Sequence, residues 1–142
     1  MMTIVIEEEY IHCSKRGVIT APIYFDFGDF QFPEVGWSDF IVIISGWWLD
    51  AIQKLNQGWE REIELCFMDG PMIIKLTLGE RDDLLLECVN QRGRVDIIEY
   101  KTTITKELIV SKLLSNAKNI LKLCRENNWQ SADIDTLSKL VK

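Results

Sequence analysis

The chain has 142 residues, of which 47% are hydrophobic and 27% charged, a composition typical of one folded domain over residues 1–142. Its longest apolar run, Phe40 to Leu49, is too short for a membrane span of about 20 residues, and the first residues lack the pattern of a secretory signal. The formal net charge is −6: residues 1–100 hold 8 basic and 18 acidic side chains, whereas residues 101–142 hold 8 and 4. We therefore expect a cytoplasmic protein with no membrane partner, whose acidic body disfavours nucleic acid and favours a basic protein partner.

Two strands are expected before the first helix. Thr3–His12 and Val18–Phe27 are rich in β-branched and aromatic residues, and the turn Lys15–Gly17 separates them. Pro22 has no N–H to donate to a sheet ladder, so we expect it at a sheet edge or at a bulge. The two strands are predicted to form a hairpin, which the loop Gly28–Gly36 follows.

Helical periodicity predicts a first helix that begins near Ser38 and ends at Gly58. Ser38 is the expected N-cap, and Asp39 would lie at the positive end of the helix dipole. Gly46 costs about 1 kcal/mol of helix propensity relative to Ala, so we expect another element to pack close to it. The apolar residues recur at spacings of three and four: Phe40, Ile44, Trp47, Trp48, Ala51, Ile52 and Leu55.

Four strands joined by short turns are expected next, followed by two helices. The strands are predicted from period-two alternation or from turn signals on both sides: Glu60–Met68, Met72–Leu78, Asp83–Val89 and Arg94–Lys101. Asp69-Gly70-Pro71 is typical of a hairpin turn. The helices are predicted over Lys106–Asn127 and Ser131–Val141. The order ββαββββαα indicates an α+β fold, an antiparallel sheet of about six strands with helices on one face.

Glu60, Glu62 and Glu64 are the partner-binding residues that we expect. Period two places the three side chains on one face of a strand. Such a row is most often the solvated face of a half-buried sheet, and it could also bind a cation or act in acid–base chemistry. A docking strip for a basic protein fits the acidic body, and it is the hypothesis to test first.

Few residues indicate catalysis or a cofactor. His12 is the only histidine, and because neighbours on a strand point to opposite faces it does not pair easily with Cys13. The other cysteines, Cys66, Cys88 and Cys124, are isolated in sequence, which predicts small buried side chains and no zinc site. Phosphate-loop, dinucleotide-binding and metalloprotease motifs are absent from the sequence. We expect no enzyme and no cofactor.

The tryptophans and the basic C-terminal residues have ordinary structural explanations. Trp37, Trp47, Trp48 and Trp59 are expected mainly in a core between helix and sheet, and a partly exposed one would be a binding hot spot. The basic residues of the long C-terminal helix are spread around it without interleaved aromatics, so nucleic-acid binding is not expected: Lys106, Lys112, Lys118, Lys122 and Arg125.

The stretch from Trp37 to Pro71 resembles a pattern in small uncharacterised bacterial proteins of about this length: W-S-D-F…W-W…L…L…G…F-M-D-G-P. The resemblance covers about a quarter of the chain, and its elements are structural. It implies a non-enzymatic protein of the immunity type, which binds and neutralises a bacterial toxin.

The expected function is a non-enzymatic protein-interaction module that binds its partner through an acidic surface. Two alternatives remain open. A small enzyme with its site near His12 requires a pocket that converges on this residue. A small-ligand-binding protein that uses the Phe30–Trp37 loop requires an apolar cavity beneath the loop.

Overall fold

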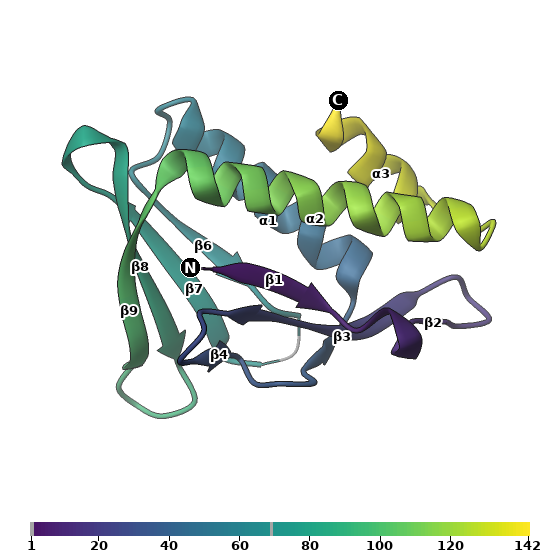
Figure 1. The fold of residues 1–142 in the computed structure, drawn as a ribbon, viewed down its shortest axis with the longest axis horizontal. Helices are drawn as coiled ribbons and strands as arrows, with labels where there is room; N and C mark the ends of the chain where they lie inside the picture. Colours follow the sequence, from purple (N-terminus) through teal and green to yellow (C-terminus); the bar gives the residue numbers. More distant parts are fainter. Residues whose placement is uncertain (1, 69) are drawn as a thin grey trace.

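The computed structural model describes residues 2–68 and 70–142 and shows an α+β fold (Figure 1). The first sheet contains β1 (Thr3–Ile6), β2 (His12–Cys13), β3 (Ile19–Asp26), β4 (Gln31–Phe32) and β5 (Ser38–Asp39). The second sheet contains β6 (Glu62–Cys66), β7 (Met72–Leu78), β8 (Asp83–Asn90) and β9 (Ile97–Thr105). The helices are α1 (Ile41–Asn56), α2 (Lys106–Glu126) and α3 (Ala132–Val141), with 3-10 turns η1 (Glu8–Tyr10) and η2 (Glu80–Asp82).

The predicted fold class is confirmed, with one difference in the sheet. The strands divide between two antiparallel sheets, where the sequence pattern suggested a single sheet of about six strands. The second sheet has the order β6-β7-β8-β9, which is the expected meander. Of the predicted turn between β6 and β7, Asp69 lies outside the described residues.

Strand β3 is the centre of the first sheet, and Pro22 explains how its neighbours are arranged. The ladder with β1 ends at Ile23, and the ladder with β2 begins at Thr20. Between them the chain forms η1, so the predicted strand Thr3–His12 is broken, and the Glu7 N–H donates to the Pro22 carbonyl at 3.1 Å. Pro22 therefore lies at a gap in the ladder inside the sheet, since it cannot donate a hydrogen bond there.

Helix α1 begins later than predicted and ends as predicted. Ser38 pairs with β3 as part of β5, so it is not the N-cap; the helix starts at Ile41 without a side-chain cap. At the other end, Gly58 has φ +81°, and the N–H groups of Gly58 and Trp59 donate to the carbonyls of Leu55 and Lys54. This pair of bonds is a Schellman motif, which requires the left-handed conformation that glycine adopts without strain.

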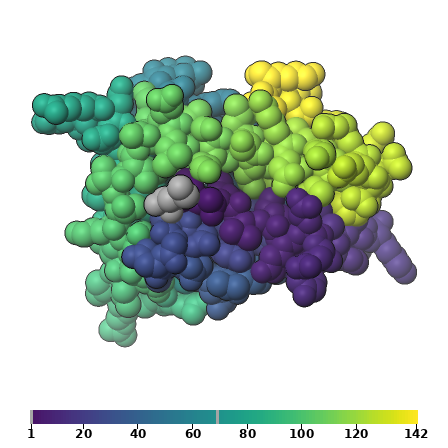
Figure 2. Space-filling view, in the orientation of Figure 1, coloured from purple at the N-terminus to yellow at the C-terminus, as the bar shows by residue number. Residues whose placement is uncertain are grey.

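The core lies between the two sheets and the helices. Trp48 is fully buried, its ring centroid lies 5.4 Å from that of Phe67, and its indole N–H donates to the Cys66 carbonyl at 2.8 Å. Helix α2 crosses α1, where buried Asn116 donates to the hydroxyl of Ser45 at 2.9 Å. Figure 2 shows α2 lying along the N-terminal strand on this face of the molecule.

Candidate functional site

The second sheet has one face in the core and one face directed away from it. Ile63 and Leu65 of β6 are buried in the core, while Glu62 and Glu64 between them are exposed. Figure 1 shows α1 and α2 on one side of this sheet. We call the opposite side the outer face and define it by the outward residues of its four strands: Glu62, Glu64, Lys75, Thr77, Leu85, Glu87, Lys101 and Thr103.

Two of the three predicted contact residues lie on the outer face. Glu62 and Glu64 belong to β6, but Glu60 precedes the strand, so the prediction that all three share one strand face is wrong for Glu60. The exit from α1 explains the difference, because the Glu60 N–H still points to the Lys54 carbonyl at 3.3 Å. Glu60 is nevertheless exposed and adjoins the outer face.

The centre of the outer face is balanced in charge. Strand register places Glu64 opposite Lys75, Lys75 opposite Glu87, and Glu87 opposite Lys101. Cross-strand neighbours of opposite charge stabilise a sheet by about 0.2–1 kcal/mol each. Glu64 therefore belongs to an alternating row of charges, and it does not form an acidic strip with Glu60 and Glu62.

Acidic residues outnumber basic residues around the turn between β7 and β8. The Leu78 N–H donates to the Arg61 carbonyl at 2.7 Å, which brings the start of β6 beside this turn. We call this region the acidic end, defined by one tryptophan and five carboxylates: Trp59, Glu60, Glu62, Glu80, Asp82 and Asp83. Two arginines, Arg61 and Arg81, belong to the same segments. The region therefore keeps a net negative charge.

Trp59 is the most exposed tryptophan of the chain. Its side chain is 73% exposed, whereas Trp48 is fully buried and Trp37 donates its indole N–H to Asp39. Its position follows from the Gly58 motif, which turns the chain out of α1 before the alternating pattern of β6 begins. The sequence could have indicated this exposure, since Trp59 lies between the helical pattern that ends at Gly58 and the alternating pattern of β6 and belongs to neither apolar face.

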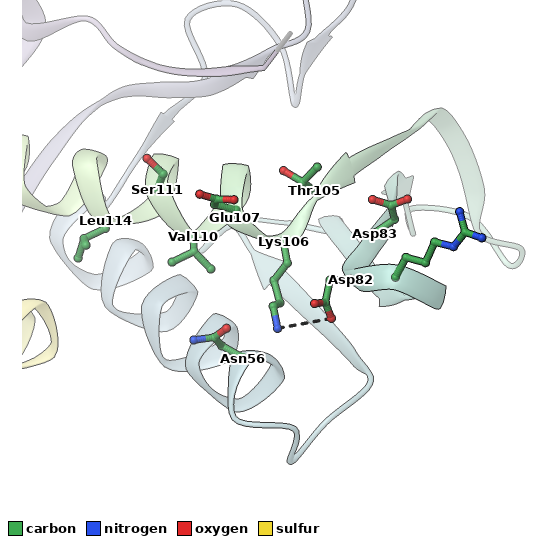
Figure 3. A pocket seen from close by; sticks show the side chains of 10 residues that line it. Asn56, Asp82, Asp83, Thr105, Lys106, Glu107, Val110, Ser111 and Leu114 are labelled. Atoms are coloured by element: carbon green, nitrogen blue, oxygen red, sulfur yellow. Dashed lines mark ion pairs between the residues drawn. The ribbon is translucent and has the colours of Figure 1, made fainter.

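The largest of the described hollows lies beside the acidic end (Figure 3). It has a volume of about 690 Å³ and lies between the end of α1, the first turns of α2 and the β7–β8 turn. Val110 and Leu114 supply apolar lining, and the Lys106 ammonium lies 3.8 Å from a carboxylate oxygen of Asp82. Both signs of charge line the hollow, so its electrostatics select neither an anion nor a cation.

The turn beside this hollow has a strained backbone. Arg81 and Asp82 have φ angles of 59° and 62°, in the left-handed region that non-glycine residues occupy at a cost of about 1–2 kcal/mol each. The strained turn holds Arg81 and Asp82 at the rim of the hollow and Glu80 at the acidic end. Strained non-glycine residues cluster at binding sites, so the strain in this turn supports the hypothesis that the acidic end is a contact region.

His12, the residue near which a small enzyme would have its site, lies at the surface. It is exposed on the two-residue strand β2 opposite Thr20, and none of the described hollows is lined by it. Burial raises the pKa of the Cys66 and Cys124 thiols. Burial, with a smaller contribution from Glu99, raises the pKa of Cys88 to about 12. These thiols therefore stay protonated near neutral pH and are poor nucleophiles.

The Phe30–Trp37 loop is filled by packed aromatic rings. Phe30 stacks on Tyr100 with ring centroids 5.1 Å apart, and Phe32 is fully buried with its centroid 6.1 Å from that of Phe67. The described hollow nearest to this cluster has a volume of about 250 Å³ and is lined by Phe27 and Tyr100. The rings occupy the space that a ligand beneath the loop would need.

Asp39 is a buried carboxylate that the sequence pattern misassigned to the helix start. Only 3% of it is exposed, and its oxygens accept from the Trp37 indole N–H at 2.9 Å and the Phe40 N–H at 2.7 Å. They also accept from the Met68 N–H at 3.1 Å. The carboxylate therefore joins the start of α1 to Met68, which follows β6 and lies 29 residues away in the sequence, and its role is structural.

Residues 2–68 and 70–142 contain no group of three or more acidic, histidine or cysteine side chains placed to hold a metal ion. Over the same part of the chain, no helix has the length and apolarity that crossing a bilayer requires. Comparison with protein-family models, with curated protein sequences and with solved structures finds no match to this chain. The evidence for the candidate site therefore comes from the geometry of this chain and not from related proteins.

Proposed function

We propose that this protein is a non-enzymatic interaction module that binds a basic protein partner through the acidic end and the adjoining outer face. The exposure of Trp59 beside Glu60 and Glu62 carries the proposal. A tryptophan buried on association is a common energetic centre of an interface, and surrounding charges set orientation and association rate. The charge-balanced row of Glu64, Lys75, Glu87 and Lys101 would then lie at the edge of the interface with the partner.

The partner class that best fits is a basic toxin domain, for which the chain would act as an immunity protein in a bacterial cytoplasm. The resemblance of the Trp37–Pro71 stretch suggests this class, and the net charge of −6 favours capture of a cationic domain. The four free cysteines are compatible with a reducing compartment. A toxin gene directly upstream of the gene for this chain would support the assignment.

The test compares two triple variants with the same charge change. Glu60→Gln, Glu62→Gln and Glu64→Gln neutralise the expected contact residues and change the net charge from −6 to −3. The control variant carries Glu9→Gln, Glu34→Gln and Glu126→Gln at exposed positions in η1, in the β4–β5 loop and at the end of α2. Each immobilised protein is exposed to extract of the native cell, and the dissociation constant of any basic protein retained by the wild type is then measured.

We expect the control variant to keep the affinity of the wild type and the contact variant to bind at least about tenfold more weakly. The affinity of the wild type should fall as salt rises, because exposed charges are screened beyond about 8 Å at physiological ionic strength. Equal affinity of the two variants for the same partner would refute binding through Glu60, Glu62 and Glu64.

A further inference from the structure

A second groove lies between α1 and α3. It has a volume of about 430 Å³, and α1 contributes Gly46, Trp47 and Asp50 to its walls. Helix α3 packs beside position 46 and leaves room for a small side chain there: a Cβ atom would lie 3.8 Å from the Leu140 Cδ1 atom, an ordinary contact distance. The close packing expected at Gly46 is therefore not found, since α3 makes only an ordinary contact there, and the groove opens beside this contact.

The lining of the groove combines an apolar wall with carboxylates. Val42, Leu137 and Leu140 supply aliphatic surface, and Trp47 leaves 44% of its side chain exposed. The ionisable residues that line it are Asp50 and Asp133, and no lysine or arginine is among the lining residues. Asp50 is already 3.2 Å from Lys54, whereas Asp133 forms no ion pair within the described residues.

This chemistry fits a group with an apolar stem and a cationic head. A guanidinium stacks on a tryptophan face and bonds a carboxylate through two parallel N–H groups, whereas an ammonium is a point charge with a stronger hydration shell. An arginine side chain has both the stem and the planar head. The net charge of −6 adds a general attraction for the basic segment that would carry it.

We propose that the α1–α3 groove is a binding site for an arginine side chain of a basic protein segment, with Trp47 as the stacking surface and Asp133 as the anionic contact. This site is separate from the acidic end and the outer face, and it does not depend on the function proposed for them. It gives a reason for an exposed Trp47 beside the fully buried Trp48.

The experiment is an NMR titration of the whole ¹⁵N-labelled chain. The probe is the blocked dipeptide acetyl-Leu-Arg-amide, and the control probe replaces arginine by citrulline, which keeps the shape of the side chain and removes its charge. The indole N–H resonance of Trp47 is assigned from the spectrum of Trp47→Phe. Asp133→Asn tests the anionic contact, and Asp135→Asn is the matched control, because both aspartates are exposed in the first turn of α3 but only Asp133 lines the groove.

We expect the arginine peptide to shift the Trp47 indole resonance in a saturable manner. The dissociation constant of the citrulline peptide should be at least about fivefold higher. Asp133→Asn should weaken binding of the arginine peptide, and Asp135→Asn should leave it unchanged. Equal affinity for the two peptides would overturn the proposal, and so would equal effects of the two aspartate variants or an unshifted Trp47 resonance.

Discussion

Replacement of Asp39 should reduce stability more than the replacement of any exposed carboxylate. Its oxygens accept from three N–H groups at 2.7–3.1 Å, and these belong to Trp37, Phe40 and Met68. Asp39→Ala leaves three donors without their acceptor in a largely buried setting, and each loss costs about 1 kcal/mol net. We expect the free energy of unfolding to fall by about 3 kcal/mol, a large part of the 5–15 kcal/mol typical of a domain.

Asp39→Asn separates the loss of charge from the loss of the whole group. The amide oxygen can still accept from the Phe40 N–H and, at 3.3 Å, from the Met68 N–H, but the amide nitrogen would face the Trp37 indole N–H, which is itself a donor. We expect a loss of about 2 kcal/mol for this variant. The control is Glu34→Ala, an exposed site in the same part of the chain, for which the change should stay within about 0.5 kcal/mol.

Urea unfolding followed by tryptophan fluorescence and circular dichroism measures these differences. With a slope of about 1.5–2 kcal/mol per molar urea, a loss of 3 kcal/mol lowers the unfolding midpoint by about 1.5–2 M. A midpoint for Asp39→Ala within about 0.3 M of the wild type would refute the reasoning. It would mean that water satisfies the three donors as well as the carboxylate does.

Three further predictions follow from single residues. Trp59→Ala should change the free energy of unfolding by no more than about 0.5 kcal/mol in a urea titration, yet weaken binding of the retained basic partner at least about tenfold. Gly46→Ala should raise the free energy of unfolding by up to about 1 kcal/mol, and with it the melting temperature, because alanine favours a helix and its Cβ reaches Leu140 at an ordinary contact distance. Gly58→Ala should lower the melting temperature, because the backbone at position 58 has a φ of +81°. The raised pKa of Cys88 stabilises the fold below pH 9, the ordinary thiol value, and this contribution should be lost as pH rises toward about 12. Cys88→Ala should flatten that part of the stability–pH curve, and an unchanged curve would contradict the assignment.

Much of the local structure could be predicted from the sequence. The end of α1 at Gly58, the alternation of buried Ile63 and Leu65 with exposed glutamates, and the β6–β9 meander all follow from residues a few positions apart. The start of α1 could not be predicted in this way. Asp39 has the sequence position of a capping residue, but its carboxylate accepts from Met68, which is 29 residues away.

The candidate site shows the same division. The acidic residues Glu60 and Glu62 and the exposed Trp59 are visible as a cluster in the sequence, and the exit motif at Gly58 accounts for their position. The neutralising row around Glu64 depends on the register of β6 and β7, and the position of the acidic end depends on the approach of the β7–β8 turn to Arg61.

By itself the sequence determines the helices α1, α2 and α3, the exit from α1 at Gly58 and the strands of the meander, because periodicity, caps and turn residues act over one or two turns of backbone. Only the tertiary structure decides that the strands form two sheets around β3 and the meander, that Asp39 is buried, that Glu64 faces Lys75 and that α3 leaves a groove beside Gly46. Those features arise from contacts between residues far apart in the chain. Their free energy depends on how the whole core packs, and no local pattern contains that information.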